Sequence, residues 1–182
     1  MDPFLNLLTT HSTEKTIAKN EFLLTEGRVD QNIYFIKSGA IRVFLQTEFE
    51  EMTIRFGYKD SIITSISSFL NDTPSEFFMQ AIRSTTLGVI SKSHFMAFVK
   101  ESDENAQWYL KLLENLVTQQ MEREIDLLTP SPSERLQRVL ERSPQLFQEV
   151  PSKYIASYLR MTPETLSRIR NAKDTTATDC TD

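Results

Sequence analysis

Residues 152–169, SKYIASYLRMTPETLSRI, carry apolar side chains at the positions where a helix-turn-helix closes its small core. Two short helices that cross at a steep angle need apolar residues on both inner faces and in the turn between them. Ala156 falls where the two helices would touch, and only a small side chain fits there. The stretch therefore predicts a helix-turn-helix with a core formed by Ile155, Leu159, Met161, Leu166 and Ile169.

The second helix of this stretch has a well-marked start. The hydroxyl of Thr162 can cap free backbone N–H groups, and Pro163 at the first helical position loses no hydrogen bond. Arg160 occupies the turn position that usually holds glycine, where a left-handed backbone costs a larger residue about 1 kcal/mol. Such a second helix normally enters the major groove of DNA. An ordinary helical hairpin is the alternative interpretation of the same pattern.

Charge is divided unevenly along the chain, which has a net charge of -5. Residues 131–173 hold 8 Lys and Arg against 4 Asp and Glu, whereas residues 1–130 hold 12 against 18. This division of charge is typical of a protein in which a cationic domain faces DNA phosphates and an acidic domain acts as a sensor. The cationic excess is modest and predicts weak non-specific binding to DNA at physiological salt. Solvated surface charge is the alternative.

Length and composition predict a soluble chain of one or two domains, since 182 residues with 40% hydrophobic content can supply real cores. Only Cys180 could form a disulfide, and it lies in a polar C-terminal segment. No apolar run approaches the ~20 residues of a membrane span, and the N-terminus lacks an export signal. We therefore expect a cytoplasmic protein without a membrane partner.

Between residues 21 and 95 the apolar residues alternate with mostly polar neighbours, which predicts short, half-buried strands. Turn residues at 26–27, 37–39 and 57–60 separate these strands. Short strands with regular turns indicate an antiparallel sandwich or roll. The alternating apolar positions are Ile33, Phe35, Ile41, Val43, Leu45, Met52, Ile54 and Phe56.

Between Asp103 and Leu128 the apolar residues return to helical spacing. A helix over this range would be about 39 Å long, because each residue adds about 1.5 Å, and this length exceeds what a small roll can cover. We expect part of the apolar stripe to pack on the roll and the remainder on the same helix of a second chain. Burial within one chain is the alternative. The stripe consists of Leu110, Leu113, Leu116, Val117, Met121 and Leu127.

The segment Thr129-Pro130-Ser131-Pro132 ends this long helix, because a proline disfavours helix in the residue before it. We interpret the segment as a hinge whose movement would change the spacing of two recognition helices in a dimer. Ser131 as the cap, with Glu134 three residues later, predicts a capping box that starts a new helix. The inner face of that helix would carry Leu136, Val139 and Leu140.

The order of a β-roll, a long helix, a hinge, a short helix and a helix-turn-helix resembles the Crp/Fnr family of bacterial transcription regulators. Residues 161–169, MTPETLSRI, look like the recognition helix of that family, and residues 34–43, YFIKSGAIRV, look like a strand-turn-strand of its sensory roll. The fold class predicted is α+β. It comprises an antiparallel, jelly-roll-like β-roll at 1–102, a long dimerisation helix with its hinge at 103–130, a winged-helix-like helix-turn-helix domain at 131–173, and a polar tail at 174–182.

The resemblance implies a homodimer on double-stranded DNA, with Glu164 and Arg168 against base edges of a two-fold related site. A carboxylate can accept from the cytosine amino group, and a guanidinium can donate twice to guanine. An exposed helical ion pair between these two residues, worth about 0.3 to 0.5 kcal/mol, is the alternative. RNA polymerase is a further partner consistent with the resemblance. Contacts to DNA phosphates, which set register on the duplex, are predicted for Lys153, Thr162, Thr165, Ser167 and Arg170.

The sensory half departs from the cyclic-nucleotide-binding pattern that the resemblance implies, in which a Gly-Glu pair meets the ribose and an Arg-Ser pair holds the phosphate. Those places read Ile63-Thr64 and Ser75-Glu76 here. Without its arginine the site loses a bidentate contact, and a glutamate would repel the anion. We therefore predict that cyclic AMP is not the effector. A pocket for another ligand would be lined by Ile63, Thr64, Ser75, Glu76, Phe77 and Thr118, and a filled or vestigial pocket is the alternative.

The sequence predicts no cofactor, no metal site and no catalytic activity. One cysteine is too few for an iron–sulfur cluster, and two histidines 83 positions apart cannot form the clustered metal site of a cupin enzyme. His11 and His94 are interpreted as surface or capping residues rather than haem ligands. A degenerate sensory module that acts through protein partners without binding DNA is a further alternative, which Arg160 and the acidic tail keep open.

Overall fold

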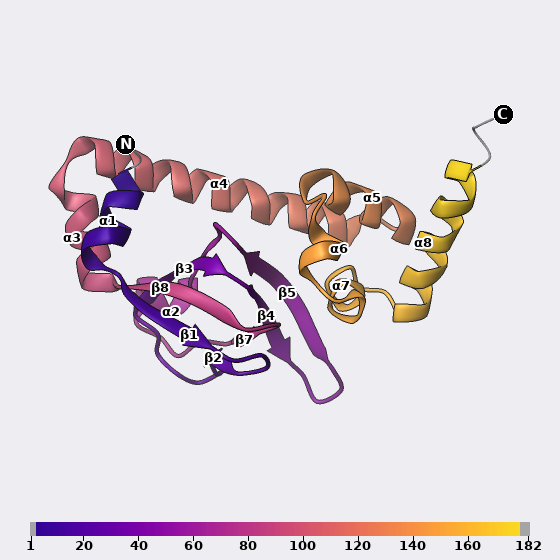
Figure 1. Ribbon diagram of the computed structural model, residues 1–182, viewed down its shortest axis with the longest axis horizontal. Helices are drawn as coiled ribbons and strands as arrows, with labels where there is room; N and C mark the ends of the chain where they lie inside the picture. Colours follow the sequence, from indigo (N-terminus) through magenta and orange to yellow (C-terminus); the bar gives the residue numbers. More distant parts are fainter. Residues whose placement is uncertain (1–2, 179–182) are drawn as a thin grey trace. The chain divides into compact units, whose positions relative to one another are not determined.

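The computed structural model describes residues 3–178 of the chain and the side chains of residues 4–172. The chain divides into two compact units, residues 1–118 and residues 119–182. The boundary lies inside helix α4 (Asp103–Leu128), which fills the range predicted for the long helix (Figure 1). No helix in the described part of the chain is both long enough and apolar enough to cross a membrane.

In the described residues of the first unit, the strands pair antiparallel in two four-stranded sheets (Figure 1). They are β1 (Thr13–Ile17), β2 (Phe22–Leu24), β3 (Asn32–Ser38), β4 (Ala40–Gln46), β5 (Glu51–Tyr58), β6 (Ile62–Ile63), β7 (Phe78–Ala81) and β8 (Thr85–Ser91). One sheet has the order β1-β8-β3-β6, and the other has the order β2-β7-β4-β5. Both sheets contribute side chains to one interior core, so the predicted antiparallel roll is confirmed.

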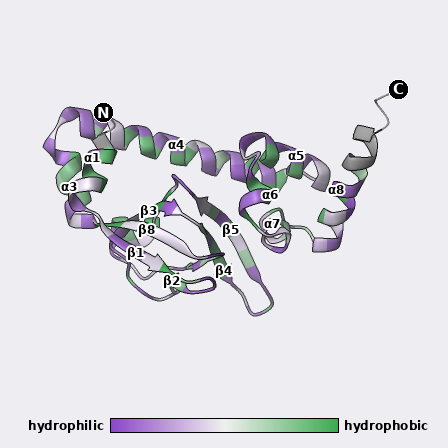
Figure 2. Ribbon diagram, in the orientation of Figure 1, coloured by the Kyte–Doolittle hydropathy of each residue, from purple (hydrophilic) through white to green (hydrophobic). Residues whose placement is uncertain are grey.

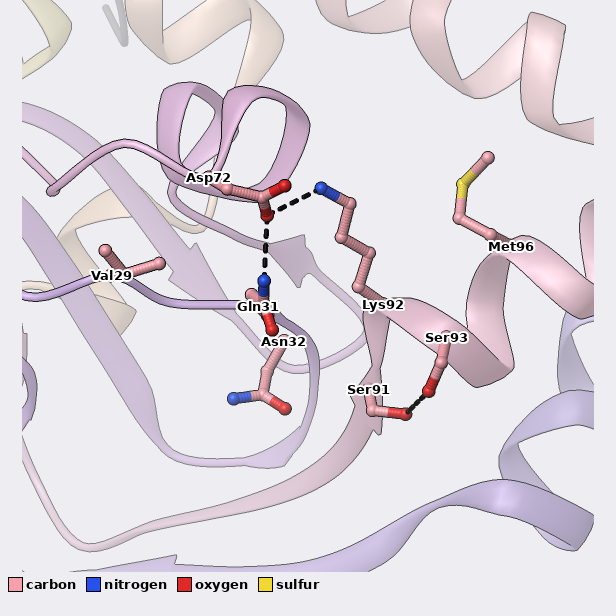
Figure 3. A pocket seen from close by; sticks show the side chains of 8 residues that line it. All are labelled: Val29, Gln31, Asn32, Asp72, Ser91, Lys92, Ser93 and Met96. Carbon is pink, nitrogen blue, oxygen red and sulfur yellow. Dashed lines mark hydrogen bonds and ion pairs between the residues drawn. The ribbon is translucent and has the colours of Figure 1, made fainter.

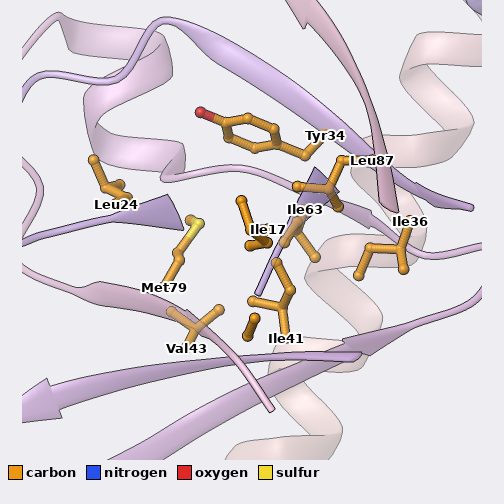
Figure 4. Close-up of a cluster of buried hydrophobic side chains, with 10 residues drawn as sticks. Ile17, Leu24, Tyr34, Ile36, Ile41, Val43, Ile63, Met79 and Leu87 are labelled. Carbon is orange, nitrogen blue, oxygen red and sulfur yellow. The ribbon is translucent and has the colours of Figure 1, made fainter. Parts of the chain in front are cut away.

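The interior of the roll is filled with apolar side chains from both sheets (Figure 4). Each of these side chains is less than a tenth exposed. Full burial of a large aliphatic side chain stabilises the fold by roughly 1.5–3 kcal/mol, so this core supplies much of the stability of the unit. The core residues are Ile17, Leu24, Tyr34, Ile36, Ile41, Val43, Ile63, Met79, Ala81 and Leu87.

Strand β3 is covered on both faces, so the prediction of a half-buried strand is wrong here. Tyr34 and Ile36 face the interior of the roll. The predicted residues Ile33 and Phe35 pack instead in a second core with helices α1 (Pro3–His11), α2 (Ile66–Asn71), α3 (Lys92–Glu101) and the start of α4. In that second core the rings of Phe4 and Trp108 stack with their centroids 4.8 Å apart. The apolar side chains of β3 therefore alternate between two cores, instead of between a core and solvent.

Strand β4 departs from the prediction for a different reason, because the polar side chain on its other face is also buried. Arg42 is 4% exposed, and its Nε and Nη2 donate to Gln80 Oε1 at 3.0 and 2.6 Å. Its guanidinium pairs with Glu51 at 2.5 Å and lies 4.0 Å from the centre of the Phe44 ring. A buried charge requires such partners, and a sequence pattern does not reveal them.

The turn between β3 and β4 requires a glycine. Gly39 has φ +92°, in the region that favours glycine. A Cβ at this position would lie 2.4 Å from Thr85 Oγ1 and 2.5 Å from the backbone oxygen of Ser84. The Gly39 turn predicted from the sequence therefore also packs closely against the start of β8.

In its described residues the second unit is entirely helical. After the end of α4 come α5 (Pro132–Arg142), α6 (Leu146–Glu149), α7 (Ser152–Tyr158) and α8 (Pro163–Thr178). No strand is seen within these residues. They form the helices of the predicted winged-helix-like domain but not the strands of a wing. Helix α8 extends past the predicted domain end at 173, and Cys180 of the predicted tail lies outside the described residues. The buried core comprises Leu136, Val139, Leu146, Val150, Ile155, Ala156, Leu159 and Leu166.

The apolar stripe of α4 is not covered by the described residues of its own chain. Val117 and Met121 are 61% and 54% exposed, while Leu113 and Leu116 are half-buried. Figure 2 shows hydrophobic and hydrophilic residues interleaved along this helix. The stripe thus presents an uncovered apolar surface, which was expected for a helix longer than the roll can cover.

Candidate functional site

The start of α8 is built as the sequence predicts. The backbone N–H of Thr165 donates to Thr162 Oγ1 at 3.2 Å, and Pro163 is the first residue of the helix. The hydroxyl oxygens of Thr162 and Thr165 lie 3.2 Å apart. These contacts satisfy a backbone donor that a helix start otherwise leaves free.

The core predicted for the helix-turn-helix is also present. Ile155, Leu159 and Leu166 are buried, and Ala156 is buried where α7 meets α8. Met161 and Ile169 are half-buried. Burial of this face leaves the opposite face of α8 exposed to solvent.

Glu164 and Arg168 both lie on the exposed face of α8, one turn apart. Hydrogen bonds from its own backbone N–H and from the Thr162 hydroxyl lower the pKa of Glu164, so its carboxylate is charged at neutral pH. Among the described side chains no ion pair joins Glu164 to Arg168. The carboxylate is turned toward the helix start, and the guanidinium is available to another molecule.

Each of the two basic side chains predicted to contact phosphate lies over a neighbouring aromatic ring. Lys153 Nζ lies 4.6 Å from the centre of the Tyr154 ring. The guanidinium of Arg170 lies 4.2 Å from the centre of the Phe147 ring, and its Nη1 donates to Ser152 Oγ at 3.3 Å. These contacts place Arg170 beside the first residue of α7. Of the remaining predicted phosphate contacts, Thr162 and Ser167 are exposed and Thr165 is half-buried.

Two arginines that the sequence analysis did not single out lie at the end of α7. Arg123 donates to the backbone oxygen of Tyr158, and Arg135 donates to that of Leu159. The sequence gives no local signal for them, because their partners lie 35 and 24 positions away. Arg160 adopts φ +54° at the place that usually holds glycine, and its amide donates to the oxygen of Ser157.

Most of the residues predicted to line an effector pocket are taken up by packing or by hydrogen bonds within the described part of the first unit. Ile63 is buried in the interior core of the roll, and Phe77 packs against that core. Thr64 Oγ1 donates to the backbone oxygen of Asn32 at 2.8 Å. Glu76 is exposed, and so is Thr118, whose hydroxyl donates to a backbone oxygen of its own helix. Their positions favour the filled-pocket alternative.

Ser75, the sixth predicted pocket residue, forms a neutral pair with a residue that the sequence analysis missed. Ser65 Oγ donates to Ser75 Oγ at 2.9 Å, and both residues are buried. Ser75 Oγ in turn donates to the backbone oxygen of Phe77 at 3.0 Å. These hydroxyls are satisfied by each other and by the backbone, and neither carries the positive charge that an anionic phosphate requires.

Asp30 is a buried carboxylate that borders the interior core. Its Oδ1 accepts from Tyr34 Oη at 3.0 Å and from Asn32 Nδ2 at 2.9 Å, and its backbone N–H donates to Ser68 Oγ at 2.6 Å. Its Oδ2 has no partner among the described residues. Burial raises the pKa of Asp30 and also raises the pKa of Tyr34. The side chain that accepts the hydrogen bond of Tyr34 at the edge of this core is therefore an acid and not a cation.

An open depression of about 850 Å³ lies elsewhere on the first unit, at the starts of β3 and α3 (Figure 3). Its charged groups contact each other, since Asp72 accepts from Lys92 Nζ and from Gln31 Nε2, both at 2.8 Å. None of the six predicted effector residues is among those that line it. The lining residues are Val29, Gln31, Asn32, Asp72, Ser91, Lys92, Ser93 and Met96.

The two histidines lie together on the surface of the first unit. His11 ends α1 and His94 lies in the first turn of α3, with ring centroids 5.0 Å apart. His94 Nδ1 is 3.1 Å from Ser91 Oγ. Within the described residues no group of three or more His, Cys, Asp or Glu side chains is placed to hold a metal ion.

Comparisons with known proteins agree with this architecture. Residues 14–102 match the family model of the cyclic nucleotide-binding domain. The structure is similar to a CooA mutant from Carboxydothermus hydrogenoformans, with TM-score 0.75 and 22% identity over 94% of this chain and 79% of that one. It is also similar to FixK2 from Bradyrhizobium japonicum, with TM-score 0.78 and 19% identity over 91% and 86% of the two chains.

A third solved structure, the Thermus thermophilus catabolite activator protein, matches with TM-score 0.59 and 18% identity over 97% of this chain and 85% of that one. A search of curated protein sequences gives no match. The family match covers the roll, and the structural matches extend over the long helix and the helix-turn-helix. Residues 14–102 therefore match the cyclic nucleotide-binding domain, and the chain as a whole has the fold of the Crp/Fnr-type regulators.

Proposed function

We propose that this protein is a sequence-specific DNA-binding transcription regulator that acts as a homodimer on a two-fold related site. The observation that carries the proposal is the helix-turn-helix, whose second helix begins at Pro163 and presents Glu164 and Arg168 on its exposed face. A guanidinium in that position can donate to guanine O6 and N7, and a carboxylate can accept from cytosine. The fold that the chain shares with Crp/Fnr-type regulators supports the same conclusion.

The second step of the proposal is dimerisation through α4. The uncovered stripe, with Val117 and Met121 more than half exposed, is an apolar surface that a single chain leaves in water. Such a surface on a long helix is stabilised by packing against the same surface of a second copy. A symmetric pair would present two recognition helices to successive major grooves, about one DNA turn apart.

The third step is that cyclic AMP does not control the protein. A cyclic phosphate needs a cationic partner, whereas the roll offers the neutral pair Ser65 and Ser75 and the buried acid Asp30. The interior core is also filled by apolar side chains such as Leu24, Tyr34 and Met79 (Figure 4). Both features disfavour an anionic nucleotide in the roll.

The test is selection of bound duplexes from a random pool at low ionic strength. We expect enrichment of an inverted repeat with half-site centres about one helical turn apart. A single half-site would contradict the dimer, and a pool without enrichment would contradict DNA recognition. In the latter case the alternative function, an interaction module that acts through protein partners, would replace the proposal.

A further inference from the structure

The C-terminal end of α7 has an unusual set of partners. The last carbonyl groups of a helix have no partner within it, and a glycine in the left-handed conformation commonly allows the chain to satisfy them. This chain has Arg160 there, with φ +54°. The Arg160 amide and that of Met161 donate to the oxygens of Ser157 and Ala156, as in a glycine-capped helix. The next three backbone oxygens, those of Tyr158, Leu159 and Arg160, accept from side chains of α4 and α5.

Arg135 of α5 joins two segments of the backbone. Its Nε donates to the oxygen of Leu159 at 3.0 Å, and its Nη2 donates to that of Arg160 at 3.4 Å. Its Nη1 donates to the oxygens of Thr129 and Pro130 at 2.8 and 3.3 Å. The planar guanidinium carries donors on several sides, so one side chain fastens the linker after α4 to the turn before α8.

Arg123 of α4 holds the same turn from another direction. It is 8% exposed, its Nη2 donates to the oxygen of Tyr158, and its guanidinium lies 3.7 Å from the centre of the Tyr158 ring. A cation at a helix C-terminus is favoured by the helix dipole, and the ring contact adds to this attraction. The final turns of α4 are therefore attached directly to α7.

A buried carboxylate attaches α4 to α5 as well. Asp126 is fully buried and accepts from Arg138 Nε at 2.9 Å and from Arg142. Arg142 also pairs with Glu122 at 2.9 Å. The linker itself is hydrogen-bonded, since the backbone N–H of Thr129 donates to the oxygen of Ile125 at 3.0 Å. In agreement with these contacts, the second compact unit begins within α4, before the linker.

We propose that Arg123 and Arg135 are positioning residues that fix the start of the recognition helix relative to the end of α4. The final turns of α4, the linker at 129–132 and the helix-turn-helix then move as one block. The linker is not the hinge that its two prolines suggest, and movement between the two units would occur upstream of it. This inference rests on the proposed DNA binding for its function and on the contacts above for its geometry.

The experiment replaces Arg135 by lysine in the full-length protein. Lysine keeps the positive charge but not the planar set of donors, so contacts to four backbone oxygens cannot all be retained. We expect affinity for a duplex selected by the wild type to fall roughly tenfold, because charge-assisted hydrogen bonds that position the helix are lost. Affinity for a random duplex and its salt dependence should not change, because the net charge is the same.

Hydrogen exchange supplies a readout that does not depend on DNA. The amides of Arg160 and Met161, which donate to Ser157 and Ala156, should exchange faster in Arg135→Lys than in the wild type. The same substitution at an exposed arginine of the first unit, Arg28→Lys, is the matched control and should change neither readout. Should Arg135→Lys fail to fold, Arg123→Lys tests the same contacts at the end of α7.

The possible outcomes separate this inference from the proposed function. Wild-type affinity and unchanged amide exchange in Arg135→Lys would overturn the positioning role. Rapid exchange of the Thr129 amide in the wild type would overturn the single block and restore the linker as a hinge. If the wild type selects no duplex, the proposed function fails, while the exchange of Arg160 and Met161 still decides whether the two arginines hold the turn.

Discussion

Arg168 and Lys153 are both exposed cations of the second unit, yet they are expected to contact different parts of DNA. Arg168→Ala should weaken binding to the selected site by about 1 to 3 kcal/mol and relax base choice at one position, because a base contact carries sequence information. Lys153→Ala should weaken binding to all sequences alike and reduce the salt slope by about one. Fluorescence anisotropy on selected and random duplexes at several salt concentrations measures both effects.

The two substitutions serve as controls for each other. Equal losses on selected and random duplexes in Arg168→Ala would mean that this side chain contacts the phosphate backbone. An unchanged affinity in both variants would favour the partner-binding module over the DNA-binding regulator.

Asp30 gives a prediction about pH. Burial raises its pKa in the folded protein, so the fold binds this proton more tightly than the unfolded chain does. The resulting stabilisation is fully present below the ordinary pKa of about 4 and is lost as pH rises through the raised value. Asp30→Asn keeps an oxygen that can accept from Tyr34 and removes the charge. We therefore expect this variant to gain stability relative to the wild type as pH rises across that window.

Urea unfolding at a series of pH values tests the expectation, with Asp60→Asn as the matched control at an exposed, left-handed position. A tenfold difference in proton affinity between the folded and unfolded states corresponds to about 1.4 kcal/mol. A constant difference between Asp30→Asn and the wild type from acid to neutral pH would show that the carboxyl group does not titrate differently in the fold.

At the level of single residues, sequence patterns located the helix-turn-helix but not the interactions that complete it. The Thr162 cap and the buried Leu166 follow from local spacing, because their partners lie within a few residues. Ser65 and Ser75 are ten positions apart, and Arg123 and Tyr158 are 35 apart. Contacts at such separations depend on the folded arrangement, and a single sequence carries no periodic signal for them.

At the level of elements, α4 carries the prediction about assembly. Val117→Glu places a charge in the centre of the exposed apolar stripe, and a charge buried between two helices without a partner is strongly disfavoured. We expect this variant to be monomeric at concentrations where the wild type is dimeric. Light scattering coupled to size-exclusion chromatography measures the mass directly.

Gln119→Glu supplies the control, because helical spacing places residue 119 on the side of α4 opposite residue 117, and Gln119 is also exposed. It should leave the mass of the assembly unchanged. A dimeric Val117→Glu variant would mean that a surface other than the α4 stripe joins the two chains.

The elements also show where periodicity is informative and where it is ambiguous. The long helix and the start of α5 match their predicted bounds, because proline, caps and helical spacing act locally. Alternation along β3 was interpreted as one buried and one solvated face, but the covering helices come from distant segments. In the sequence, an apolar residue on an alternating strand looks the same whether the opposite face of the strand is solvated or covered by helices. Tertiary packing therefore decides the burial of both strand faces.

At the level of the whole molecule, the filled roll leads to a prediction about ligands. A nucleotide present at 100 times its Kd would stabilise the protein by about 2.7 kcal/mol. We expect neither cyclic AMP nor cyclic GMP to raise the melting temperature, because Ser65 and Ser75 supply no cation for the phosphate. A thermal-shift series over a wide range of nucleotide concentration tests this. A saturable rise with cyclic AMP would show that the roll admits the nucleotide after rearrangement.

The pairing of β1 with β8 has a consequence for how the chain acquires its structure. Thr13 lies opposite Val89, so the first sheet brings together residues 76 positions apart in the sequence. On a ribosome the first unit cannot close until almost its entire length has emerged, and its nascent strands would stay open to mispairing until then. Hydrogen bonds within the helices of the second unit join residues four positions apart, so these helices can form soon after they are synthesised. Refolding from denaturant should accordingly be limited by closure of the roll.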